Sequence, residues 1–195
     1  MRSGVSLFDE HWISEGQLSR TAELAASTND LPGEVIEIGV HQGLSAIPIA
    51  NAVYPKVLHA VDHWDWQQVL NGDERYDPHD HAGSLSAIGL TQEIISRDNH
   101  GIFQENVREG TQGNVQIWKM GWREFAAQWT RPVRFLHIDA MHTADEVADN
   151  IRAFLPFAVE GAIFCGDDYQ YPPVSEGVAR CFDANDESAL WWVRI

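Results

Sequence analysis

The sequence is poor in cysteine and has no long apolar run. Its 195 residues include only two cysteines, Cys165 and Cys181, which are too few for a disulfide framework or a cysteine-rich zinc site. We expect both to be buried thiols. No apolar run approaches the roughly 18 to 20 residues that span a bilayer, and no apolar signal core follows the N-terminus. These absences predict a cytoplasmic protein with no membrane partner.

Basic residues are also scarce. The chain has 13 Lys and Arg against 29 Asp and Glu, which gives a formal net charge of -16. Such an excess repels phosphate backbones, so nucleic acid is not expected as a partner. The length suits one substantial core, and we expect residues 1–195 to form a single domain.

Apolar strands alternate with amphipathic helices along most of the chain. This order predicts an α/β fold with a doubly wound, mostly parallel sheet and helices on both faces. A turn is expected at Glu160-Gly161, and Ser14 is expected to cap the leading helix. The predicted helices span residues 13–27, 46–53, 103–107, 122–129, 144–157 and 174–182, and the predicted strands span 35–38, 57–62, 115–119, 133–138, 162–165 and 189–195.

Residues 63–100 interrupt this alternation. They are rich in Trp, Asp and His, and we expect a helix only over residues 84–96. Long connections in compact α/β domains are commonly lids or binding loops, so this segment is interpreted as a substrate-facing insertion. Its histidines, His63, His79 and His81, either form part of a second metal site or belong to a solvated polar loop, and the latter is favoured.

The most informative segment is the first strand and the turn after it, which read E-x-G-x-x-x-G-x-S from Glu37 to Ser45. Strand-to-helix turns of this kind lie where doubly wound sheets bind their ligands. The turn lacks the middle glycine that brings backbone amides close to a dinucleotide pyrophosphate, so a nicotinamide cofactor is disfavoured. Glu37 suits a cationic amino-acid group, and Gly39 and Gly43 leave room for a ligand, a combination that fits S-adenosylmethionine.

The second strand ends in Asp62, at about the separation where such sheets place a carboxylate on ribose hydroxyls. Asp62 is therefore the predicted ribose ligand. The alternative is that the glycine turn is only a tight connection without a ligand.

Three more acids follow later strands. Asp139 ends the fourth strand, and Asp167 and Asp168 end the fifth. Parallel strands would bring these carboxylates to one edge, where they repel one another unless a cation or protons intervene. Oxygen ligands suit Mg²⁺, so a magnesium site is predicted, although each Asp alone could equally cap a helix or turn the chain.

Together these motifs resemble class I S-adenosylmethionine-dependent methyltransferases. The likeness covers about residues 30 to 171. Within this class, the sequence most resembles the metal-dependent O-methyltransferases that act on sugars and other small molecules. It rests on the glycine turn, on Asp62, on His137-Ile-Asp139-Ala-x-His142 and on Gly166-Asp167-Asp168-Tyr169. The resemblance implies a Rossmann-like fold and the following roles. The methionyl part of the cofactor would lie on Glu37, Gly39, Gly43 and Ser45, the ribose on Asp62, the adenine beside Gly121 and Trp122, and the metal on Asp139, Asp167 and Asp168.

One position departs from the family pattern. Many relatives have an acid where this chain has Met141, so His142 becomes the candidate general base, beside Asp139 as the other catalytic residue. Asp139 would also border the cofactor.

The resulting hypothesis is Mg²⁺-assisted O-methyl transfer from S-adenosylmethionine to a small sugar-like, phenolic or other hydroxylated acceptor. Two alternatives stay open: a non-catalytic cofactor-binding or assembly module, and a metal-dependent enzyme of another reaction type on the same carboxylate edge.

Paired Trp191 and Trp192 in the last strand should point to opposite faces, and they make a homodimer plausible.

Overall fold

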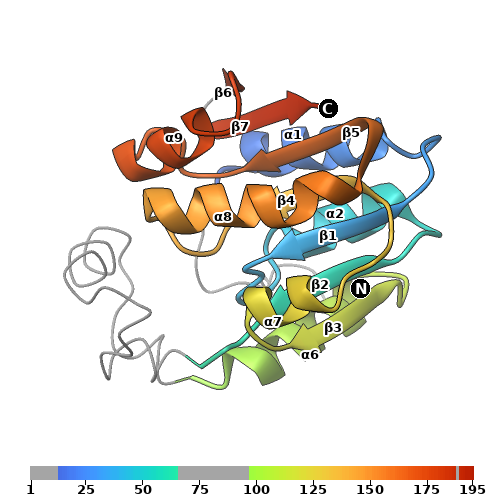
Figure 1. The fold of residues 1–195 in the computed structure, drawn as a ribbon. Coiled ribbons are helices and arrows are strands. Elements are labelled where there is room, and N and C mark those ends of the chain that lie inside the picture. Colours follow the sequence, from blue (N-terminus) through green and yellow to red (C-terminus); the bar gives the residue numbers. More distant parts are fainter. Residues whose placement is uncertain (1–12, 66–96, 188) are drawn as a thin grey trace.

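A computed structural model describes residues 13–65, 97–187 and 189–195. Their strands form one seven-stranded sheet of order β3-β2-β1-β4-β5-β7-β6, in which every pair is parallel except the two made by β7. The predicted mostly parallel α/β sheet is thus confirmed (Figure 1). The strands are β1 (Glu34–Ile38), β2 (Leu58–Asp62), β3 (Val115–Lys119), β4 (Val133–Ile138), β5 (Ala158–Gly166), β6 (Asn185–Glu187) and β7 (Leu190–Arg194).

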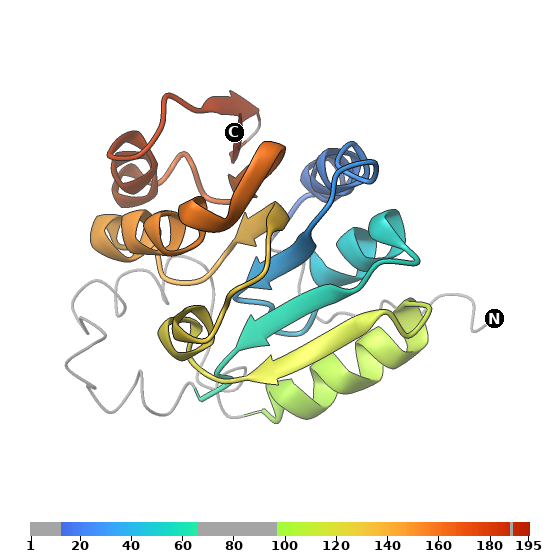
Figure 2. The same ribbon diagram turned by 45° about the vertical axis from the view of Figure 1, so that its right-hand side comes forward.

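Helices cover both faces of this sheet, as the view in Figure 2 shows. One face carries α1 (Glu15–Ala26), α2 (Ala46–Val53) and α6 (Asn99–Gly110), and the other carries α7 (Trp122–Ala127), α8 (Ala144–Phe154) and α9 (Pro172–Ala179). A 3-10 turn, η1 (Leu155–Phe157), follows α8. Each face has its own apolar core. Because both faces are covered, β2 and β4 are buried along their whole length, as central parallel strands usually are.

The helix starts follow local sequence signals. Ser14 forms a capping box with Gln17 at the start of α1, which confirms the predicted cap. Thr143 accepts a hydrogen bond from the Glu146 amide at the start of α8. Asp98 does the same for Gly101 at the start of α6. These side chains satisfy amide groups that have no partner inside the helix.

Three elements differ most from expectation. Helix α6 is 12 residues long, whereas only residues 103–107 were predicted, because Gly101 and Gly110 weaken its helical signal. The turn predicted at Glu160-Gly161 was wrong. Strand β5 runs through it as a bulge, with Gly161 at φ +85° and its N–H donating to the Ile195 carbonyl. The short polar strand β6 was not predicted.

The last strand, β7, lies antiparallel beside β5. Trp191 is buried in the core under α8 and α9, while Trp192 packs against the core on the opposite face of the sheet. The Arg20 guanidinium of α1 lies over the Trp192 ring. The two tryptophans therefore point to opposite faces as predicted.

Cys165 is buried, but Cys181 is only half-buried and lies just past α9; both are free thiols.

The register of the strands aligns their carboxyl ends. Ile38 is opposite Val61 of β2 and Ile138 of β4, and Ile138 is opposite Gly166 of β5. The residues that follow these strands, Asp139 and Asp167 among them, therefore come out at one edge of the sheet. The predicted helix over residues 84–96 lies outside the described residues, and so do His79 and His81.

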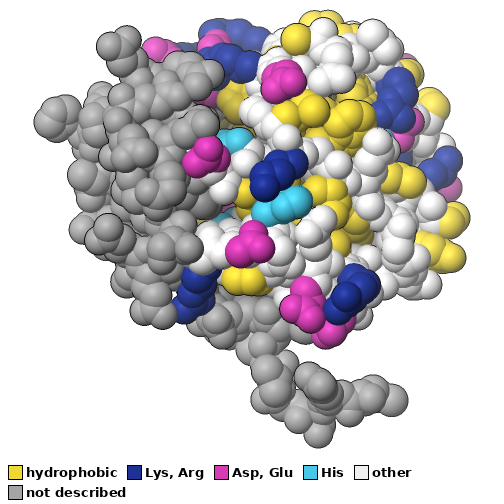
Figure 3. All heavy atoms as spheres, turned by 90° about the horizontal axis from the view of Figure 1, so that it is seen from below, with side chains coloured by type: hydrophobic (Ala, Val, Ile, Leu, Met, Phe, Trp, Pro, Cys, Tyr) yellow, Lys and Arg dark blue, Asp and Glu magenta, His cyan; other side chains and the backbone are white. Residues whose placement is uncertain are grey.

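Basic and acidic side chains are interspersed on the face shown in Figure 3. None of the helices in the described ranges is long and apolar enough to cross a membrane.

Candidate functional site

The glycine turn packs directly against the end of β4. Gly39 has φ +82°, and a Cβ placed there would lie 2.1 Å from the Asp139 carbonyl oxygen. Gly43 has φ +96°, and its Cβ would press on the Phe103 ring at 3.1 Å. Both glycines thus allow close approach of the chain itself, in backbone conformations that side chains rarely adopt. The turn is therefore in direct backbone contact with Asp139 at the sheet edge.

Beneath the turn lies a buried ion pair. Glu37 on β1 is fully buried, and its Oε1 accepts hydrogen bonds from the Ser45 hydroxyl at 2.5 Å and from His137 Nδ1 at 3.0 Å. Burial by itself lowers the pKa of His137, but the hydrogen bond and charge of Glu37 outweigh it and raise that pKa above its ordinary value. Glu37 and Ser45 therefore contact each other beneath the turn, and the contact with the cofactor that the resemblance implies for them stays a prediction.

Asp62 fastens the turn from its other side. Its Oδ2 accepts hydrogen bonds from the amides of Val40, at 3.1 Å, and His41, at 2.9 Å, and its Oδ1 accepts one from the Trp64 amide at 2.8 Å. The Trp64 indole N–H in turn donates to the His41 carbonyl at 2.6 Å. A carboxylate has about four acceptor positions, so three are used and one remains for a ligand hydroxyl.

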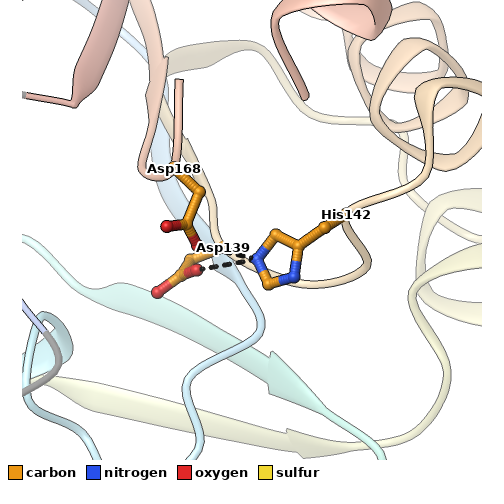
Figure 4. A group of neighbouring side chains, drawn as sticks. All are labelled: Asp139, His142 and Asp168. Atoms are coloured by element: carbon orange, nitrogen blue, oxygen red, sulfur yellow. Dashed lines mark ion pairs between the residues drawn. The ribbon is translucent and has the colours of Figure 1, made fainter. Parts of the chain in front are cut away.

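Asp139 is part of a cluster of two carboxylates and one imidazole (Figure 4). Asp139 and His142 come from the segment between β4 and α8, and Asp168 comes from the segment after β5. His142 Nε2 lies 3.0 Å from Asp168 Oδ2 and 3.8 Å from Asp139 Oδ1. One ligand atom from each of the three lies within 4.8 Å of the others. We call Asp139, His142 and Asp168 the Asp-His-Asp cluster.

The positive charge of protonated His142 and the negative charges of Asp139 and Asp168 stabilise one another. Burial disfavours the imidazolium of His142, but its contacts with Asp139 and Asp168 outweigh burial and raise its pKa to about 10. The imidazolium in turn lowers the pKa of Asp168, against the opposing effect of burial. In this charge state His142 is protonated at neutral pH. An imidazolium cannot accept another proton.

Asp167, the third acid predicted to bind metal, is not in the cluster. Its side chain turns to α1, where Oδ1 accepts a hydrogen bond from Gln17 Nε2 at 2.7 Å. Burial, together with the negative charge of Asp139, raises the pKa of Asp167 to about 7. The neighbouring Asp168 has φ +59°, a left-handed conformation that sends the two consecutive side chains in different directions.

The residues predicted to flank adenine lie at the start of α7. Gly121 is the N-cap, with nothing within 4 Å of the position where a Cβ would be. Trp122 is half-buried; its indole N–H donates to Glu146 Oε2 at 2.9 Å, and the Arg123 guanidinium lies over its ring. The open space at Gly121 is compatible with a flat ligand, whereas the Trp122 ring is already engaged by its neighbours.

The Asp-His-Asp cluster fits a divalent cation. Two carboxylates and an imidazole are common protein ligands for such ions. A cation among them would also replace the proton that the imidazole carries. Asp139 and Asp168 were predicted as metal ligands and His142 as the general base, and the structure brings these three side chains together.

Two residues of the site were missed from the sequence: His137, the partner of Glu37, and Gln17, the partner of Asp167. The signal for His137 was present, because a charged residue on each of two buried, adjacent strands requires a partner. Gln17 gave no such signal. It comes from a helix about 150 positions earlier in the chain, and its capping role at α1 fully accounts for its presence there.

A family profile described as "Methyltransferase domain" matches residues 36–169. No curated protein matches the sequence. Among solved structures, the O-methyltransferase NovP is 16% identical, with a TM-score of 0.62 and 91% of this chain and 78% of that chain covered. CalS11, a calicheamicin methyltransferase, is 12% identical, with a TM-score of 0.62 and coverage of 93% and 80%. An O-methyltransferase from Bacillus cereus in complex with SAH is 14% identical, with a TM-score of 0.55 and coverage of 94% and 82%.

Proposed function

Because this chain belongs to the methyltransferase-domain family, we propose that it transfers the methyl group of S-adenosylmethionine to a hydroxyl of a small molecule, assisted by a divalent cation. The fold is shared with O-methyltransferases, two of which are described as a calicheamicin methyltransferase and as an SAH complex. Those descriptions support a small-molecule acceptor and S-adenosylmethionine as donor.

The observation that carries this proposal is the contact between Gly39 and Asp139. It joins the turn expected to hold the methyl donor to the Asp-His-Asp cluster expected to hold the cation. Methyl transfer needs the acceptor oxygen in line with the bond between sulfur and the methyl group, so catalysis depends on holding donor and acceptor side by side. The turn and the cluster meet at Asp139, so a donor on the turn and an acceptor at the cluster would be neighbours.

In this proposal the donor lies over the glycine turn. Asp62 offers its remaining acceptor position to a ribose hydroxyl, and Asp139 borders the cationic end of the donor. Gly121 gives space for the adenine, with Trp122 at its margin. Glu37 and Ser45 support the turn from the core beneath it, because Glu37 accepts hydrogen bonds from both Ser45 and His137.

The acceptor lies at the Asp-His-Asp cluster. A divalent cation bound there would supply positive charge that lowers the pKa of an acceptor hydroxyl, so that the hydroxyl gives its proton to solvent water as the methyl group moves from sulfur to oxygen. Asp139 and Asp168 would provide carboxylate oxygens for the cation, and His142 would provide an imidazole that lies nearly perpendicular to the Tyr171 ring, 6.4 Å away between ring centroids. These residues orient the acceptor oxygen toward the donor.

The test combines binding and turnover. S-adenosylmethionine at about 100 times its Kd should stabilise the protein by about 2.7 kcal/mol, which raises the Tm by roughly 5 to 11 °C in a domain of this size. Turnover is measured with radiolabelled S-adenosylmethionine and a panel of sugars, phenols and other hydroxylated acceptors. Chelation should abolish turnover while SAH binding persists.

The matched variant is Asp168→Asn, which removes one carboxylate from the cluster without touching the glycine turn. It should bind SAH like the wild type and turn over poorly at any concentration of divalent cation. Absence of binding heat with both S-adenosylmethionine and SAH would refute the proposed function. Full turnover in excess chelator would remove the cation from it.

A further inference from the structure

We infer that His142 is a nitrogen ligand of the cation site, and that the site therefore selects a first-row transition dication over Mg²⁺. This inference rests on the proposed function only for the purpose the cation serves. The residues that carry it are Asp139, His142 and Asp168, and it differs from the all-carboxylate set of Asp139, Asp167 and Asp168 that the sequence predicted.

The first step is the environment of His142 Nε2. This atom is buried, and within the described part of the chain no acceptor meets it with the geometry of a hydrogen bond, although Asp168 Oδ2 lies only 3.0 Å away. A buried ring nitrogen that faces two carboxylates without a well-aligned hydrogen bond is placed as a ligand atom would be.

The second step is the spacing. Ligand atoms about 2.1 Å from one ion lie about 3.0 Å apart at a right angle and about 3.4 Å apart at a tetrahedral angle. The distance of 3.0 Å from His142 Nε2 to Asp168 Oδ2 equals the first value, and the distance of 3.8 Å to Asp139 Oδ1 needs only a small rotation of that carboxylate to approach the second.

The third step is the orientation of consecutive acids. Asp167 is not among the three residues whose ligand atoms come together, and its Oδ1 accepts a hydrogen bond from Gln17 Nε2 instead. The left-handed backbone of Asp168 turns its side chain to His142 instead. The imidazole of His142 thus completes the group of three that Asp167 was expected to complete.

Donor chemistry then decides the metal. Carboxylate-only sites suit Mg²⁺, which binds imidazole poorly, whereas an imidazole nitrogen favours transition ions in the Irving–Williams order. One nitrogen and two carboxylate oxygens leave the remaining coordination positions for water or acceptor oxygens. His142 is accordingly a ligand whose lone pair is used by the cation.

The test uses the full chain and three metal salts, CoCl₂, MnCl₂ and MgCl₂, without methyl donor. Calorimetry should give a Kd for Co²⁺ at least ~10-fold below that for Mg²⁺ in the wild type. In His142→Asp, which makes the group all-oxygen, this preference should fall while Mg²⁺ binding is kept or improved. Asp168→Asn should weaken Co²⁺ binding, and the matched variant Asp167→Asn should not.

Pulsed electron paramagnetic resonance of bound Mn²⁺ gives a direct readout of the ligand. An imidazole nitrogen coupling should be present in the wild type and in Asp167→Asn, and lost in His142→Gln. Mn²⁺ bound to the wild type without nitrogen coupling, equal Kd values for Co²⁺ and Mg²⁺, or no heat with any of the three ions would each overturn the inference. SAH binding, measured separately, distinguishes these failures from failure of the proposed function.

Discussion

Asp62 offers the sharpest test of how the glycine turn is held, through the substitution Asp62→Asn. The carboxylate accepts three backbone amides, two from the turn at Val40 and His41 and one from Trp64. Asparagine has the same shape but only one accepting oxygen, and its NH₂ group would face amide donors. At least one buried amide therefore loses its partner whichever way the new side chain is oriented.

The magnitude follows from that count. One unsatisfied buried amide costs about 1 to 3 kcal/mol, and the remaining bonds lose the charge assistance that makes them stronger than neutral ones. We expect a loss of about 2 to 4 kcal/mol in the free energy of unfolding. In a chain of this size each kcal/mol shifts the Tm by about 2 to 4 °C, so the Tm should fall by about 9 °C, within a range of roughly 4 to 16 °C.

The assay is thermal unfolding without any methyl donor, followed by circular dichroism. The matched control is Asp30→Asn, a loss of the same charge at an exposed position, which should change stability by less than about 0.5 kcal/mol. If Asp62 served only a ribose, its replacement would leave the Tm of the free protein unchanged and weaken SAH binding alone. That result would refute the reasoning that Asp62 fastens the turn.

Three further outcomes are expected. Gly39→Ala should destabilise the protein by at least about 2 kcal/mol more than Gly113→Ala, because both have positive φ but only Gly39 also faces backbone atoms; urea unfolding measures both, and equal losses would contradict the close approach. In chelator, the folded pKa of His142 lies above its unfolded value, so its stabilising contribution is present below about pH 6.5 and is lost as pH rises to about 10. The Tm of the wild type should therefore fall more over that range than the Tm of His142→Gln, and parallel curves would count against it. Glu37→Gln should cost about 3 to 5 kcal/mol alone and much less in a His137→Gln background, since it breaks a buried pair; additive losses in a double-mutant cycle would show that the two do not interact.

The first four strands were the part of the fold that the sequence predicted best, because each is a short segment rich in apolar residues. Residues 115–119 and 133–138 form strands at the predicted bounds. The bulge in β5 could not be foreseen, since it depends on how Gly161 meets the Ile195 carbonyl at the far end of the chain. Local signals predict elements, whereas their irregularities depend on tertiary contacts.

The candidate site shows the same division. Strand ends predicted which acids share an edge, and Asp139 and Asp168 indeed lie together there. Sequence could not predict that Asp167 and Asp168 diverge, because this depends on one left-handed backbone angle at Asp168. The sequence also could not predict that Asp62 accepts hydrogen bonds from three backbone amides of its own chain. An acid at the end of a strand is expected both for a residue that binds ribose and for one that stabilises the turn.

The position of β7 has a consequence for how the molecule is made. Gly166, directly before the acid pair, lies so close to Trp191 that a Cβ there would be 2.7 Å from the indole nitrogen. Trp191 belongs to the final strand, which completes the sheet beside β5. During synthesis from the N-terminus, the segment that carries Asp168 therefore lacks its neighbour until residues 190–194 have left the ribosome. Ribosome-bound chains that stop short of them should remain unable to assemble the Asp-His-Asp cluster.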